Sequence, residues 1–176
     1  MSDTGLIVID VQKGLLADPE KVYDAGGVLA RIDELVARAR QHGTPVIFVQ
    51  HQGAEGHPLE KPSEGWQIHP ATGYRPDDVV IEKRHCDAFQ DTELKSWLDA
   101  SGISKVVLAG MCSDYCVDTT CRRAFSLGYD VILASDAHTT LSQDHMSAEM
   151  IVRHHNIVLS SGFAKGLPSE QIKFQV

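Results

Sequence analysis

Three of the four cysteines in the chain lie within ten residues, at positions 112, 116 and 121 of the stretch "GMCSDYCVDTTCRRAF". Such a cluster is consistent with metal ligands, a redox pair, core residues or a nucleophile with its neighbours. A zinc site requires a second pair of ligands at suitable spacing, and none accompanies Cys112 and Cys116. The redox spacing C-x-x-C is also absent. The sequence therefore favours a nucleophile among core residues.

Two other residues with useful chemistry follow apolar runs elsewhere in the chain. Asp10 follows "GLIVI" and Lys83 follows "VVIE". Taken alone, Asp10 fits equally well as a loop or helix cap, and Lys83 fits better as a solvated strand end. In open parallel α/β sheets, however, ligands bind beyond the carboxyl ends of the strands. We therefore expect the acid, the amine and the thiol to converge on one edge of a sheet.

The position of Cys116 suggests how its thiol would react. We expect it in the first turn of a helix, where backbone N–H groups are unpaired and the helix dipole favours negative charge. A cysteine in that position, near a lysine, should have a lowered pKa. Asp10 could accept the thiol proton and return it to a leaving amine, while free N–H groups stabilise an oxyanion. Together these groups predict acyl transfer through a thioester.

The remaining sequence alternates apolar runs with amphipathic stretches. Strands are expected at residues 5–11, 45–50, 79–83, 105–110, 130–135 and 156–160, and helices at 26–43, 92–102, 114–128 and 144–155. Between the second and third strands lies a long stretch rich in Gly, Pro and His, which is typical of a functional loop. This alternation predicts an α/β three-layer sandwich, with a six-stranded parallel sheet and helices on both faces. We expect a single domain over residues 1–176.

Composition restricts the partners. The chain has 176 residues and a net charge of −8, whereas nucleic-acid binding requires a basic surface. No apolar run approaches the ~18 residues of a membrane-spanning helix. The N-terminal stretch "MSDTGLIVIDVQ" has no basic region of the kind that begins a signal peptide, so we expect a cytoplasmic protein with reduced thiols. A small molecule is the expected partner, with neither nucleic acid nor membrane.

Three motifs, in order, resemble one known family. They are "LIVIDVQKG", "VVIEKRHCDAFQDTELKSWLDASGI" and "VVLAGMCSDYCVDTTCRRAFSLGYDVILASDA". The chain resembles the isochorismatase-like cysteine hydrolases, which include nicotinamidases, N-carbamoylsarcosine amidase, ureidoacrylate amidohydrolases and streptothricin hydrolase. The resemblance implies a Rossmann-like, isochorismatase-like hydrolase fold and no cofactor. It also implies that Cys116 is the nucleophile, Asp10 the base and acid, and Lys83 the charge partner.

The resemblance carries two further expectations. It implies a cis peptide bond between Met111 and Cys112, which would turn the N–H of Cys112 into an oxyanion hole together with that of Cys116. It also implies a homo-oligomer, either a dimer or a tetramer. A long loop that contains Trp66 offers apolar surface that a monomer would leave exposed.

Two departures from the family pattern bear on the substrate. Metal-binding nicotinamidases carry Asp-x-His after the second strand, where this chain has Gln50, His51 and Gln52. We therefore expect no metal, and nicotinamide is disfavoured as a substrate. Many members also carry a phenylalanine against the substrate, where this chain has Leu15 or Leu16. Leu15, Trp66 and Tyr115 are candidate substrate contacts.

Three functions were weighed. The preferred one is hydrolysis of a non-peptide C–N bond, in an amide or lactam of a small molecule, through a thioester acyl-enzyme. One alternative is vinyl-ether hydrolysis of the isochorismatase type, which needs no thiol and leaves Cys116 unexplained. The other is a non-catalytic flavodoxin-like binding module, which would need a phosphate-binding loop. Neither G-x-G-x-x-G nor G-x-x-x-x-G-K-[ST] occurs in the chain.

Overall fold

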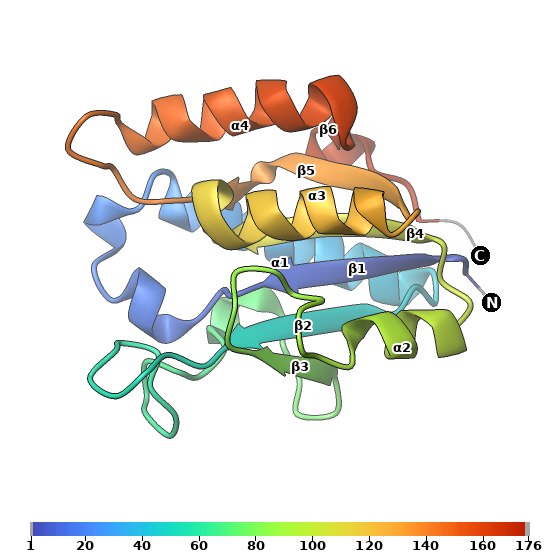
Figure 1. Cartoon of the computed structure of the whole chain (residues 1–176), viewed down its shortest axis with the longest axis horizontal. Coiled ribbons are helices and arrows are strands. Elements are labelled where there is room, and N and C mark those ends of the chain that lie inside the picture. The colour runs from blue at the N-terminus through green and yellow to red at the C-terminus, as the bar shows by residue number, and fades with distance from the viewer. Residues whose placement is uncertain (1, 175–176) are drawn as a thin grey trace.

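The computed structural model describes residues 2–174 and places six parallel strands in one sheet, in the order β3-β2-β1-β4-β5-β6 (Figure 1). The strands are β1 (Thr4–Ile9), β2 (Val46–His51), β3 (Val79–Lys83), β4 (Lys105–Met111), β5 (Asp130–Thr139) and β6 (Lys165–Leu167). Every pairing between neighbouring strands is parallel. The predicted α/β class and the six-stranded parallel sheet are confirmed.

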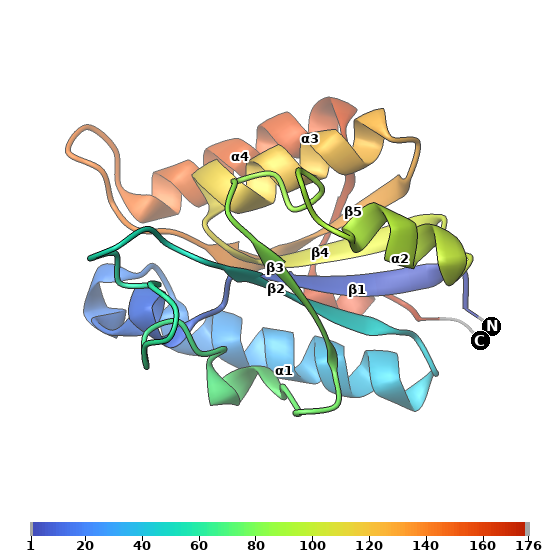
Figure 2. The same ribbon diagram turned by 60° about the horizontal axis from the view of Figure 1, so that its bottom comes forward.

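Helices cover both faces of this sheet. They are α1 (Ala25–Gln41), α2 (Leu94–Ala100), α3 (Asp118–Ser126) and α4 (Ala148–Gly162). Figure 2 shows α1 on one face and the other three helices on the opposite face. The strand order runs outward from β1 in one direction through β2 and β3, and then resumes with β4 on the other side. This reversal opens a crevice at the carboxyl ends of β1 and β4, where ligands of such sheets bind.

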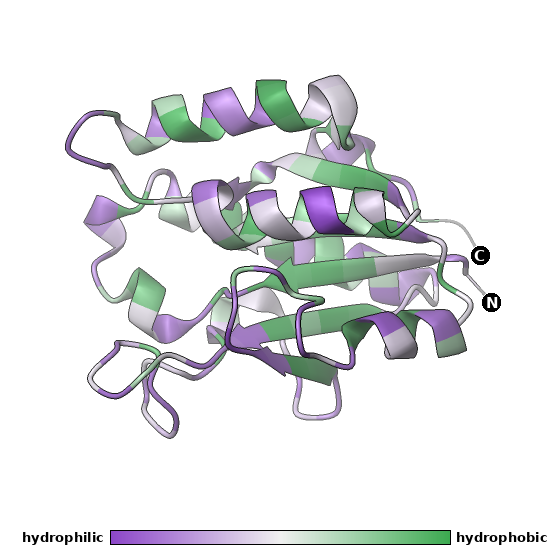
Figure 3. Cartoon of the chain, viewed as in Figure 1, coloured by the Kyte–Doolittle hydropathy of each residue, from purple (hydrophilic) through white to green (hydrophobic). Residues whose placement is uncertain are grey.

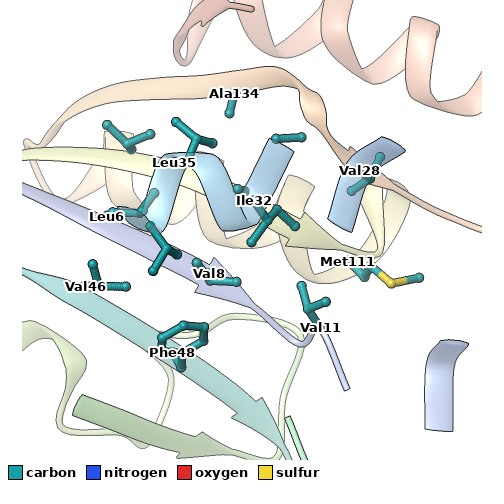
Figure 4. Packing of buried hydrophobic residues seen from close by; sticks show 14 of the residues in the cluster. Leu6, Val8, Val11, Val28, Ile32, Leu35, Val46, Phe48, Met111 and Ala134 are labelled. Atoms are coloured by element: carbon teal, nitrogen blue, oxygen red, sulfur yellow. The ribbon is translucent and has the colours of Figure 1, made fainter. Parts of the chain in front are cut away.

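Alternating side chains of β1 belong to two hydrophobic cores, one on each face of the sheet. Leu6 and Val8 pack toward α1 with Phe48 and Ile32, whereas Ile7 and Ile9 pack toward the three helices of the opposite face (Figure 4). A strand buried on both faces needs a continuous apolar run, which explains the composition of "GLIVI". Figure 3 shows apolar residues concentrated in the strands of the sheet, whereas the helices carry a mixture of polar and apolar residues.

The sixth strand is not where the sequence analysis placed it. Residues 156–160 continue α4, and the edge strand β6 follows at Lys165–Leu167. The helix buries Ile151, Val152 and Leu159 at helical spacing, so the apolar run "NIVL" is the end of an amphipathic pattern. Its start was also expected too early, because Ser147 caps the helix by accepting a hydrogen bond from the N–H of Met150.

Gly110 lets β4 approach β1 closely. It pairs in register with Ile9 and has a φ of +127°, a conformation that L-residues rarely adopt. A Cβ at this position would lie 2.1 Å from the carbonyl oxygen of Ile9. Only glycine therefore allows β4 to run beside β1 up to the point where both strands deliver residues to the crevice.

We expect Gly110→Ala to lower the free energy of unfolding by at least about 2 kcal/mol, because it combines backbone strain with overlap against a neighbouring strand. Urea denaturation measures the change. Gly26→Ala in α1 is the control, since a Cβ there meets no atom within 4 Å. Alanine should stabilise that helix position by ~0.5–1 kcal/mol. Equal effects of the two substitutions would contradict this account of Gly110.

Candidate active site

The site is organised around a buried ion pair. Asp10 directly follows β1 in a left-handed conformation, with φ of +50°, which aspartate tolerates better than most residues. Lys83 is the last residue of β3. Its Nζ lies 2.7 Å from Oδ2 of Asp10, and the two side chains are 0% and 2% exposed. A carboxylate and an ammonium removed from water in this way require each other, because either charge alone would be strongly destabilised.

The Lys83 ammonium also contacts the thiol. Its Nζ lies 3.2 Å from Sγ of Cys116, 2.9 Å from the carbonyl oxygen of His85 and 3.3 Å from Nδ1 of His51. The structure thus brings Asp10, Lys83 and Cys116 together, from three separate segments of the chain. Asp136 at β5, another polar residue near a strand end, lies outside this group and binds Ser169 instead.

Cys116 sits in a wide turn between β4 and α3. The turn spans Ser113–Val117, and α3 begins only at Asp118. The carbonyl of Cys112 accepts hydrogen bonds from the N–H groups of Tyr115 and Val117, both at 3.1 Å. The N–H of Cys116, which lies between them in sequence, takes part in neither bond. The peptide bond between Met111 and Cys112 is cis.

Burial raises the pKa of the Asp10 carboxyl, and the Lys83 charge only partly opposes this effect. Burial acts to lower the pKa of Lys83, but the Asp10 charge and the hydrogen bonds to Asp10 and Cys116 outweigh it, so the pKa of Lys83 is raised. These two shifts keep a proton on Lys83 and make Asp10 a stronger base than an ordinary aspartate.

The expected lowering of the pKa of Cys116 is wrong. Burial raises the pKa of this thiol, the Asp10 carboxylate raises it further, and the Lys83 charge recovers only part of the difference. The sequence argument considered the helix start and the lysine but could not see the burial. With its pKa raised, the Cys116 thiol holds its proton more firmly than an ordinary cysteine, and the thiolate forms only when that proton leaves.

Sequence reasoning missed two residues that support this arrangement. His51 is the last residue of β2 and was regarded as a loop histidine. Its pKa is lowered to about 4 by burial, by the Lys83 charge and by neighbouring histidines, so its neutral ring can accept from Lys83 through Nδ1. Gln12 is fully buried and donates to the carbonyls of His51 and Trp66, at 3.0 and 2.7 Å. It ties the long loop to the ends of β1 and β2.

The three candidate substrate contacts lie in different settings. Leu15 packs on the edge of the α1-side core, and Tyr115 is half exposed beside Cys116. Trp66 lies under the Lys61 ammonium, and its Nε1 is buried with no hydrogen-bond partner in the part of the chain that the structure describes. None of these placements tests substrate contact, which stays a prediction.

Two cavities differ in their relation to the Asp10–Lys83–Cys116 group. One of about 450 Å³ borders Lys83 and is lined by polar side chains, including Gln52 and His85. A larger cavity of about 720 Å³ is lined by Arg31, His138 and neighbouring residues and includes no member of the Asp10–Lys83–Cys116 group. We assign the site from the ion pair and the thiol, because these carry chemistry and cavity size alone does not.

Over residues 2–174, no three His, Cys, Asp or Glu side chains converge so as to hold a metal ion. No helix within the same residues is long and apolar enough to cross a membrane.

Comparison with known proteins identifies the family. The model of the isochorismatase domain matches residues 4–161, which include Asp10, Lys83 and Cys116. The chain belongs to the isochorismatase family. Membership accounts for the parallel sheet with helices on both faces.

Relatives and solved structures agree with this membership. A streptothricin hydrolase of Streptomyces noursei is 38% identical over 135 residues, covering 77% of this chain and 49% of that protein. With a second streptothricin hydrolase covered to 54%, the chain spans about half the length of the curated relatives that it matches first. An isochorismatase from Pseudomonas putida superposes with a TM-score of 0.90 at 31% identity, over 97% of this chain and 90% of that one. The N-carbamoylsarcosine amidase of Thermoplasma acidophilum shares the fold, with a TM-score of 0.80 at 23% identity over 98% and 99% of the two chains.

Because the Asp10 carboxylate helps to raise the pKa of Cys116, Asp10→Asn should lower that pKa. We expect the pH profile of Cys116 alkylation by iodoacetamide, followed by peptide mapping, to move to lower pH. Asp99→Asn is the control, since its carboxylate binds Lys95 and Tyr129, has no contact with the site and should leave the profile of Cys116 in place. A profile unchanged or moved upward in Asp10→Asn would show that Asp10 does not act on the thiol.

Proposed function

We propose that this chain is a cysteine hydrolase that cleaves a non-peptide C–N bond, in an amide or lactam of a small molecule, through a thioester on Cys116. The observation that carries the proposal is the contact of one buried ammonium, Lys83 Nζ, with both Asp10 and Cys116. A base, a nucleophile and a fixed positive charge in hydrogen-bond range are the parts needed for covalent acyl transfer. The similarity to streptothricin hydrolases supports a C–N bond as the target.

In the first half-reaction, Sγ of Cys116 attacks the substrate carbonyl carbon while its proton passes to Asp10. The raised pKa of Asp10 suits it to accept this proton. Lys83 remains protonated and offsets the negative charge that passes from the carboxylate to the substrate oxygen. The N–H groups of Cys112 and Cys116 are the proposed donors to that oxyanion.

The tetrahedral adduct then collapses. The C–N bond breaks, and Asp10 gives its proton to the departing nitrogen, which leaves as an amine and returns Asp10 to the carboxylate. The acyl group stays on Cys116 as a thioester. In the second half-reaction Asp10 takes a proton from water, the hydroxide oxygen attacks the thioester carbon, and the C–S bond breaks. The thiolate recovers the proton from Asp10, and the carboxylic acid leaves.

Cys116→Ala should reduce turnover by at least about 10⁴-fold, because no other group in the proposed mechanism can form the acyl-enzyme. A panel of amides and lactams, screened by intact mass spectrometry after rapid acid quench, should reveal an acyl adduct that maps to Cys116. Cys86→Ala is the matched control, since that thiol is exposed and lies outside the site. Retained turnover in Cys116→Ala would reject thioester chemistry and favour a hydrolysis that needs no thiol.

We also expect activity without a metal ion, because the proposed steps use Lys83, Asp10 and backbone N–H groups for all charge stabilisation. Exhaustive dialysis against EDTA or phenanthroline should leave kcat and KM unchanged for whichever substrate the panel identifies. Loss of activity that added zinc restores would reject the metal-free mechanism.

A further inference from the structure

Two buried polar side chains, Ser113 and His138, and the half-buried side chain of Asn156 form a series of hydrogen bonds outside the Asp10–Lys83–Cys116 group. Oγ of Ser113 lies 2.7 Å from Nδ1 of His138, and Nε2 of His138 lies 3.0 Å from Oδ1 of Asn156. Ser113 and His138 are 0% and 1% exposed. Polar groups that are buried this completely are stable only when each has a partner, so the three side chains hold one another in place.

The hydrogen bonds run in one direction. The Asn156 amide nitrogen donates to the carbonyl of Ser135 at 2.8 Å, which turns its oxygen toward His138. Nε2 of His138 must then carry the hydrogen, and its bare Nδ1 accepts from the Ser113 hydroxyl. Burial lowers the pKa of His138 to about 4; the Asn156 hydrogen bond and the Asp136 charge oppose this shift, and the charge of His155 adds to it. The imidazole is therefore neutral at neutral pH, as this pattern requires.

At one end of this series of hydrogen bonds, Ser113 belongs to the turn that carries the proposed nucleophile, Cys116. Ser113 is the first residue of the Ser113–Val117 turn, three positions before Cys116. The next residue, Asp114, accepts a hydrogen bond of 2.5 Å from the hydroxyl of Thr140, which follows β5. His138 and Thr140 thus fasten two successive residues of the turn to the carboxyl end of the neighbouring strand.

An irregularity in β5 makes these contacts possible. Leu108 of β4 pairs with Leu133, but Gly110, only two residues later, pairs with His138, five residues later. The extra residues of β5 bring His138 beside Gly110, just before the Met111–Cys112 peptide. Bulges near active sites commonly re-aim a side chain in this way. The irregular pairing thus places the buried His138 next to the segment that carries Cys116.

We propose that Ser113, His138 and Asn156 position Cys116, with His138 as the positioning residue that links the β5 irregularity and α4 to the nucleophile's turn. This inference rests on the proposed role of Cys116. Sγ must stay within reach of both Lys83 and the substrate carbon, and small misplacements of a reacting group reduce rates strongly. The bonds of Ser113 to His138 and of Asp114 to Thr140 hold the start of this turn against the end of β5.

Two substitutions of His138 distinguish a role in positioning Cys116 from a role that only stabilises the fold. Asn can place its amide oxygen near the site of Nδ1 and so keep the bond from Ser113, but it is too short to reach Asn156. Gln can reach Asn156 but leaves Ser113 without its acceptor. Both remove the ring and should lower the melting temperature similarly. We expect His138→Gln to reduce kcat and the rate of Cys116 alkylation about tenfold with KM within about twofold, and His138→Asn to retain most of both.

Ser113→Ala removes the same hydrogen bond with little change in volume and should reproduce the effect of His138→Gln. Ser169→Ala is its matched control, because Ser169 is also buried and its hydroxyl binds β5 through Asp136, away from the turn. It should leave the alkylation rate unchanged. If Ser113→Ala and His138→Gln lower only the melting temperature, or if His138→Asn and His138→Gln slow alkylation equally, the positioning role is rejected.

The alkylation rate is read at a fixed pH by peptide mapping and needs no substrate. It therefore tests positioning even if Cys116→Ala retains turnover, the outcome that would reject the proposed function by itself.

Discussion

The buried pairing of Lys83 with Asp10 sets the main constraint on this structure. Removing both charges from water is costly, and the pair is tolerated only with close geometry and additional hydrogen bonds, which His85, His51 and Cys116 supply. The sheet order adds a requirement of distance. Because β2 lies between β3 and β1, Lys83 must reach across about two strand spacings of ~4.8 Å. A long, flexible lysine can span this gap, and His51 at the end of β2, opposite Lys83 in register, supports the ammonium on the way.

In the mechanism that we propose, the same pair explains how a thiol with a raised pKa could react. The Lys83 charge is balanced by whichever of the carboxylate and the thiolate is ionised, so moving the proton from Cys116 to Asp10 relocates a negative charge around a fixed positive one. No charge has to enter or leave water during that transfer. Burial raises the pKa of both the Asp10 carboxyl and the Cys116 thiol. The difference between the two pKa values is therefore smaller than in a site where only the thiol is buried. The nucleophile can thus remain protonated at rest and be generated when substrate is bound.

Much of the fold and the membership of the site could be predicted from the sequence, because both follow from local patterns. Asp10 and Lys83 each stand at the end of an apolar run, and parallel strands deliver such ends to one edge. The strand expected at 156–160 was wrong because a short run of β-branched residues fits either a strand or the end of a helix. The predicted lowering of the pKa of Cys116 was wrong because burial of the thiol depends on how the whole site packs, which the sequence does not show. The contact of His138 with Ser113 could not be predicted, because it depends on the slipped register of β5, which no local pattern reveals.

These contacts divide the site into two parts with different sources of rigidity. The charged pair stands at the ends of the central strand β1 and of β3, where backbone pairing and two cores fix its position. Cys116 stands on a turn whose first two residues bind side chains at the end of β5, and His138 of β5 binds Asn156 of α4. We propose that these contacts set the orientation of Cys116. Changes in β5 or α4 can therefore reach the nucleophile without altering the ion pair. Changes in the long loop tied down by Gln12 can reshape the space in front of it. In the proposed mechanism, this separation would allow the acid–base chemistry to stay constant while the surroundings of the reacting carbonyl vary.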